Sequence, residues 1–122
     1  MNMEESESIS YLALDCLGVA VTIIDMNGII LYYNKHASEV LDRKPEYIGE
    51  KVYSHHFRSS SNKKLTSMLQ AFQNGRAEPF RYQATPYGKT ILVTLAPMFK
   101  DGQCLGCVQS VVLKEEIDSV LT

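Results

Sequence analysis

Two adjacent histidines are the residues best suited to chemistry in this sequence. His55 and His56 could ligate a haem iron or hydrogen-bond a small ligand, because a neutral imidazole carries both a metal-binding nitrogen and a donor. Adjacent side chains usually point in different directions, so only one of the two need face a binding site. The third histidine, His36, follows an expected strand and begins an expected helix, where we expect it to be exposed. The pair therefore marks a candidate ligand contact. The alternative is that His56 donates a hydrogen bond to a backbone carbonyl and fixes the loop in which it lies.

The cysteines are the second candidate. Cys104 and Cys107 have the C-x-x-C spacing of thiol redox centres, but in such centres the first cysteine begins a helix, whereas these two lie in an expected strand. Residues three apart in a strand face opposite sides of the sheet, so we expect the two thiols to point away from each other. Each is then a core residue of the strand. With Cys16 the cysteines are odd in number, which favours reduced thiols in a cytoplasm over a disulfide framework.

Length and charge exclude several classes of function. The chain has 122 residues, enough for one domain, and a formal net charge of −2, so no basic face for nucleic acid is expected. The start is acidic, unlike a signal peptide, and no apolar run approaches the roughly 20 residues that span a membrane. No glycine-rich phosphate loop, paired catalytic carboxylates or nucleophile elbow is present, so we expect no enzyme.

Hydrophobic periodicity predicts a helix and a hairpin in the first third. A helix beginning near Ser6 or Ser8 and stopped by Gly18 presents one apolar stripe: Ile9, Leu12, Ala13, Cys16 and Leu17. Strands at Val19–Asp25 and Ile29–Asn34 follow, joined by Asn27-Gly28, a pair that tolerates the positive φ of a tight turn.

The middle of the chain is helical. Short helices are expected near Ala37–Leu41 and Lys44–Gly49, followed by a longer one over Ser60–Asn74. The longer helix has an apolar stripe that must face a sheet, made of Leu65, Met68, Leu69 and Phe72.

The last third reads as an antiparallel meander. Strands are expected at Phe80–Thr85, Lys89–Phe99 and Gln103–Leu113, and a helix begins near Glu115. Pairing these strands with the earlier hairpin predicts an α+β fold, a five-stranded antiparallel sheet with helices on one face and an N-terminal amphipathic helix. We divide the chain into a helix for dimerisation or capping (1–18), the domain itself (19–114), and a C-terminal helix start or linker (115–122).

The quoted residues resemble a known family. The hairpin VAVTIIDMNGIILYYN (Val19–Asn34) resembles the opening of PAS domains. RKPEYIGEKVYSHHFRSS (Arg43–Ser60) and KLTSMLQAFQNG (Lys64–Gly75) are similar to PAS domains of DUF438-type bacterial and archaeal proteins, which read P-x-x-IG-x-x-V-x-x-CH-PPKS. His56 matches the family's histidine, and His55 stands where the family has cysteine.

The resemblance implies a sensory or regulatory module, in signal transduction or transcription regulation, that binds an unidentified small molecule between sheet and helices. No catalytic or metal-binding residue is assigned. Haem bound through His56 or His55 is an alternative. Haem-binding PAS domains typically carry an axial histidine on the long helix, and the long helix expected here has no histidine, which counts against haem. The flavin motif N-C-R-F-L-Q is absent. The candidate ligand-binding residues are Asn34, Tyr53, His55, His56, Leu65, Met68, Leu69, Phe72 and Tyr82.

Other interpretations stay open at this point. The chain could be a protein–protein interaction module whose pocket is filled by its own side chains, or a thiol redox enzyme using Cys104 and Cys107. We also expect a homodimer through the N-terminal helix, because both faces of the sheet are apolar and the middle helices cover only one. An output domain or partner protein would read the signal, and neither nucleic acid nor membrane is expected to bind.

Overall fold

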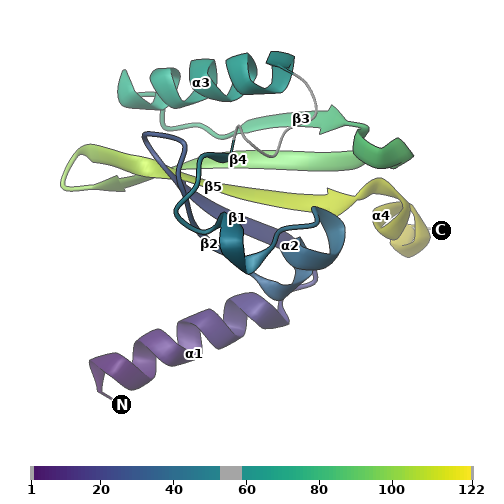
Figure 1. Ribbon diagram of the computed structural model, residues 1–122, viewed down its shortest axis with the longest axis horizontal. Helices are drawn as coiled ribbons and strands as arrows, with labels where there is room; N and C mark the ends of the chain where they lie inside the picture. Colours follow the sequence, from purple (N-terminus) through teal and green to yellow (C-terminus); the bar gives the residue numbers. More distant parts are fainter. Residues whose placement is uncertain (1, 53–58, 122) are drawn as a thin grey trace.

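Five antiparallel strands form one sheet in the order β2-β1-β5-β4-β3 (Figure 1). The structure, a computed structural model, describes residues 2–52 and 59–121. The fold is the predicted α+β fold, and each strand lies within two residues of its expected bounds. The strands are β1 (Ala20–Asp25), β2 (Ile30–Tyr33), β3 (Phe80–Ala84), β4 (Ile91–Lys100) and β5 (Gln103–Leu113).

The helices follow the predicted order, and the largest difference in their bounds is at the start of the first. The first begins at Met3, before the expected serines, because the Asn2 side chain caps it by accepting a hydrogen bond from the Glu5 backbone at 2.8 Å. The helices are α1 (Met3–Cys16), α2 (Lys35–Val40), α3 (Ser59–Gln73) and α4 (Lys114–Leu121), with short 3-10 turns η1 (Pro45–Tyr47) and η3 (Pro86–Gly88).

The turn between β1 and β2 depends on a side chain as well as on glycine. Gly28 has the positive φ of 80° that the sequence predicts. The Asp25 carboxylate accepts hydrogen bonds from the backbone N–H groups of Asn27 and Ile29, at 2.8 and 2.9 Å. Aspartate commonly organises turns in this way. The turn is therefore wider than the two-residue hairpin loop that Asn27-Gly28 alone suggested.

Helices α2 and α3 cover the same face of the sheet. The α3 side chains pack with Ile24 of β1, Leu95 of β4 and Cys107 of β5. Ala37 of α2 packs with Val111 of β5, further along the same face. Strand register agrees, because Ile24 lies opposite Cys107 and Val93 lies opposite Val111. The core therefore has two apolar clusters, one beneath each helix.

The opposite face of the sheet is only partly covered. A row of apolar side chains crosses it, with Val108 opposite both Ile23 and Ala96, and all three are half-buried. Helix α1 projects away from the sheet beyond β2 (Figure 1), and none of its residues is buried. Leu12, at the centre of its apolar stripe, is 63% exposed.

Candidate functional site

The predicted apolar stripe of α3 faces the sheet. Leu65, Met68, Leu69 and Phe72 are all buried, and together they form the centre of the larger core cluster. The Phe72 ring contacts the Phe80 ring of β3, with centroids 5.3 Å apart. These four residues thus line the interface in which a ligand was expected. Each contributes apolar surface there.

Tyr82 lies at the β3 side of the same interface. Its ring is covered by the Lys64 ammonium group of α3, 3.6 Å from the ring centroid. Burial raises the pKa of its hydroxyl. One turn beyond α3, Arg76 covers the Phe80 ring in the same way at 3.7 Å. These two cation–π contacts stabilise the packing of α3 and the chain after it against β3.

A row of polar side chains crosses the helix-covered face between the two apolar clusters. Thr22 of β1 lies opposite Tyr33 of β2 on one side and Gln109 of β5 on the other. Above the row, the buried Arg43 guanidinium donates a hydrogen bond to Gln109 Oε1 at 3.2 Å. Burial raises the pKa of the Tyr33 hydroxyl. The sequence analysis missed this row because its members come from four separate segments.

Thr22, at the centre of this row, has unsatisfied hydrogen-bonding capacity. Its side chain is fully buried, and Oγ1 has no hydrogen-bond partner among the residues that the structure describes. Buried hydroxyls are normally hydrogen-bonded, so each exception calls for a physical explanation. A signal existed in the sequence, since Thr22 is the one polar residue within an otherwise apolar stretch from Val19 to Ile24.

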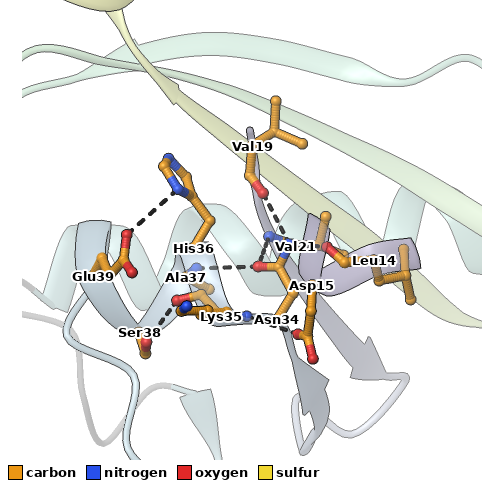
Figure 2. A network of polar contacts seen from close by, with 10 residues as sticks. All are labelled: Leu14, Asp15, Val19, Val21, Asn34, Lys35, His36, Ala37, Ser38 and Glu39. Atoms are coloured by element: carbon orange, nitrogen blue, oxygen red, sulfur yellow. Dashed lines mark hydrogen bonds and ion pairs between the residues drawn. The ribbon is translucent and has the colours of Figure 1, made fainter. Parts of the chain in front are cut away.

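Asn34, one of the predicted ligand contacts, makes structural hydrogen bonds within the fold. Its side chain is fully buried and makes four hydrogen bonds to backbone (Figure 2). Oδ1 accepts from the N–H groups of Val21 and Ala37, at 2.8 and 3.0 Å. Nδ2 donates to the carbonyls of Leu14 and Val19, at 2.7 and 2.9 Å. An amide side chain has two donor hydrogens and two acceptor lone pairs, so none is left for a ligand.

The network around Asn34 joins α1 to the sheet and to α2. Asn34 caps α2 through Ala37, and the preference for asparagine at such caps was a signal that the sequence analysis overlooked. The Asp15 carboxylate of α1 accepts from the Lys35 N–H at 2.9 Å and from the Tyr32 hydroxyl at 3.2 Å. Four elements or their ends, α1, β1, β2 and α2, thus meet at one buried amide.

The two C-x-x-C thiols lie on the same face of the sheet, which corrects the expectation that they diverge. Strand β5 has a bulge: Gly106 lies opposite Met98, and Cys104 lies opposite Phe99, so Leu105 is an extra residue. The extra residue turns Cys104 back to the helix-covered face. There it packs against the core cluster that contains Cys107.

Gly106 makes this bulge possible. Its φ is 148°, and a Cβ added at this position would lie 2.1 Å from the Ile24 carbonyl oxygen of β1. Only glycine lets the two backbones approach this closely.

Two surface hollows lie away from α3. One, of about 340 Å³, lies between α4 and the sheet and is lined by Gly18, Val112, Glu116, Ile117 and Val120. The other, of about 260 Å³, lies near Gly88 and Lys114. The predicted ligand residues Tyr53, His55 and His56 fall outside the described residues. His36 is partly exposed, with Nδ1 3.7 Å from the Glu39 carboxylate.

Comparison with known proteins identifies the fold. The family model described as PAS domain matches residues 12–112. The chain belongs to the PAS domain family. No curated protein matches the sequence.

Solved structures support the PAS fold at low sequence identity. A C-terminal domain from Streptococcus mutans has a TM-score of 0.72 at 23% identity, with 93% of this chain and 89% of that one covered. The PAS domain of an HTR-like protein from Haloarcula marismortui has a TM-score of 0.70 at 14% identity, covering 91% and 93%. The photoactive yellow protein domain of the sensor histidine kinase Ppr from Rhodospirillum centenum has 0.64 at 15%, covering 87% and 94%.

PAS domains are typically sensory or signalling modules without catalytic activity of their own. In the described ranges 2–52 and 59–121, no helix is long and apolar enough to cross a membrane. Within those ranges, no group of three His, Cys, Asp or Glu side chains is placed to hold a metal ion. The interface between α3 and the sheet, where the α3 side chains pack on β1, β4 and β5, is therefore the candidate site.

Proposed function

We propose that this PAS domain is a sensory module that binds a small molecule between α3 and the sheet. The polar row Tyr33–Thr22–Gln109 carries the proposal, because it lies between two apolar clusters on the helix-covered face. A buried hydroxyl without a partner costs about 1–3 kcal/mol, and a ligand atom that bonds to Thr22 Oγ1 would recover that energy. An apolar site with a few convergent polar groups is the usual design of a ligand pocket.

The route from this row to the terminal helix is short. Thr22 adjoins Val21, whose N–H donates to Asn34, and Tyr33 adjoins Asn34 itself. Asn34 in turn donates to the Leu14 carbonyl of α1. A ligand that draws Thr22 and Tyr33 towards itself would strain these bonds and favour a different pose of α1. The mechanism is a population shift, so the ligand must bind one pose more tightly than the other.

Native mass spectrometry and an absorption spectrum of freshly purified protein test the proposal. We expect a retained small molecule in the wild-type protein and less of it in Thr22→Val, which removes the hydroxyl but keeps the shape. Thr94→Val is the matched control, because Thr94 lies in β4 opposite Arg81 and Ser110, on the other face. Equal retention of the ligand in both variants would contradict a role for the polar row.

The same measurements decide between the rivals. An interaction module without a ligand would give the bare protein mass, and the close packing of the α3 stripe is the observation that favours this alternative. A haem sensor using His56 or His55 would give a Soret band that survives dialysis and disappears in His56→Ala or His55→Ala. Bound flavin would give its own visible spectrum.

The remaining parts of the proposal concern setting and partners. We place the domain in a cytoplasm, because its three cysteines are free thiols. The segments Arg43–Ser60 and Lys64–Gly75 relate it to the PAS domains of DUF438-type proteins. It would act as a homodimer and pass its signal to an output domain or partner protein. The exposed stripe of α1 supports the dimer, since Ile9 is 50% exposed and Leu12 is 63% exposed.

A further inference from the structure

We infer that Cys104 and Cys107 form a two-thiol site for a soft metal ion of the copper(I) type. The inference starts from the bulge in β5. Leu105 has no partner residue in β4, so Cys104 and Cys107 occupy two successive positions on one face of β5. They lie opposite Phe99 and Pro97 of β4. Both thiols therefore face the cluster beneath α3, one half-exposed and the other buried.

The orientation of Cys104 supports a joint site. Its Sγ donates to the Gly106 carbonyl oxygen at 3.4 Å. That carbonyl belongs to the peptide bond that leads into Cys107, so the contact directs the Cys104 thiol along the strand towards its partner.

Two thioethers lie in the same cluster. Met68 of α3 is buried in it, and Met26, at the end of the β1–β2 hairpin, packs against it. The chain has three cysteines and five methionines, and four of these eight residues belong to this cluster or pack against it. Core methionines are most often gap fillers. Thiolates and thioethers together are nevertheless the ligands that copper(I) prefers over harder ions.

The spacing of the thiols favours a bridging metal over a disulfide. Two successive positions on one face of a strand are about 6.6 Å apart, near the upper limit of the Cα separations that disulfides span. Metal–sulfur bonds near 2.3 Å would place the sulfurs of a two-coordinate bridge about 4.6 Å apart, which side-chain rotation can reach from that spacing. Zinc is disfavoured because it needs four ligands.

The binding step exchanges protons for the ion. Each thiol loses one proton as its sulfur bonds to the metal, so one copper(I) ion replaces two protons and the complex carries one negative charge. No electron is transferred. Because Cys104 is half-exposed, one side of the complex stays near solvent, which limits the cost of burying that charge.

Copper binding can be tested independently of signalling. Reduced protein would be titrated without oxygen against copper(I) held by bicinchoninate, following loss of the chelator's colour. We expect the wild-type protein and Cys16→Ser to take one ion, because Cys16 is exposed in α1. Cys104→Ser and Cys107→Ser should each bind at least about 100-fold more weakly, as expected for loss of one of two thiolate ligands.

Several results would overturn the inference. One is copper uptake by the Cys104→Ser/Cys107→Ser double variant equal to that of Cys16→Ser. Another is a disulfide between the two residues, formed with a hydroperoxide, in protein that takes no copper. Cys104→Ser tests the site even where Cys107→Ser unfolds, because Cys104 is not fully buried, and circular dichroism would verify each fold.

A regulatory role for the ion rests on the proposed function, in which the sheet passes a signal through Asn34 to α1. If the protein binds copper(I) but hydrogen exchange at the Val21 N–H does not change, the metal site is supported and the regulatory role is contradicted.

Discussion

Asn34, the residue that follows β2, donates a hydrogen bond of 2.7 Å from its side-chain amide to the Leu14 carbonyl of α1. This bond crosses from the PAS core to a helix that has no buried residue. The same amide group also donates to Val19, so α1 and the first residues before β1 are fixed to one side chain. A change in the core that moves Asn34 must therefore move the end of α1.

Removing that amide should destabilise the fold. In Asn34→Ala, a helix cap is lost and buried backbone groups at Val21 and Val19 lose their partners, so we expect a loss of about 3 kcal/mol in the free energy of unfolding. Chemical denaturation followed by circular dichroism measures it. Asn74→Ala, in the exposed turn after α3, should change stability by less than about 0.5 kcal/mol. Similar losses in both variants would refute the structural part assigned to Asn34.

The contact between Asp15 and Tyr32 should be visible in a tyrosine titration. Burial, and then the Asp15 carboxylate, raise the pKa of Tyr32 to about 12. Asp15→Asn removes the negative charge but not the burial, so we expect the pKa to fall and to stay above the ordinary value near 10. NMR of the tyrosine rings, assigned with Tyr32→Phe, measures the shift. Asp118→Asn, which removes a carboxylate in α4, is the control.

The same pair sets a pH dependence at the alkaline end. A raised pKa means that the folded protein holds the Tyr32 proton more tightly than the unfolded chain does. The stability from this group is therefore fully present below about pH 10 and is lost as the pH rises towards 12. In Asp15→Asn the loss should be complete at a lower pH, and an unchanged alkaline transition would contradict the contact.

Local patterns predicted the elements of this PAS domain well. The stripe of Leu65, Met68, Leu69 and Phe72 has the helical period, and all four are buried against the sheet. The three late strands alternate with clear turn residues, and their antiparallel pairing follows from short connections. Such signals are contained within ten to fifteen neighbouring residues, so one sequence is enough to read them.

Contacts between distant segments were not predictable in this way. The bulge at Leu105 depends on the approach of Gly106 to Ile24, about eighty residues earlier in the chain, and strand periodicity gives no sign of it. Arg43 is buried and donates to Gln109, 66 residues later in the chain, and no local pattern marks it as a core residue. The candidate ligand residues Tyr53, His55 and His56 stay predictions, because the described ranges do not include them.

The bulge itself offers a test with a matched control. In Gly106→Ala the new methyl group would meet the Ile24 carbonyl oxygen, so β1 and β5 must separate or shift register. We expect a loss of at least about 3 kcal/mol, as for other severe steric changes in a core. Gly102→Ala also has a positive φ, of 79°, but open space around it, so it should cost only about 1 kcal/mol. Thermal unfolding of both variants measures the difference, and equal losses would show that backbone strain alone explains the glycine.

The last prediction concerns the proposed homodimer. Helix α1 has no buried residue, and its apolar side chains Ile9 and Leu12 are half or more exposed. A second copy about a two-fold axis would cover both this stripe and the half-buried row of Ile23, Val108 and Ala96. We therefore expect a dimer at micromolar concentrations in sedimentation equilibrium.

Substitutions in α1 locate the interface. Leu12→Glu places a charge in the middle of the stripe and should shift the equilibrium to monomer without unfolding the domain, since Leu12 makes no core contact. Glu7→Lys, a change of an exposed residue on the opposite side of the same helix, should leave the dimer intact. A monomeric wild-type protein would contradict the dimer altogether. A dimer that persists in both variants would place its interface away from α1, on the open face of the sheet, and would separate dimerisation from the Asn34–Leu14 junction.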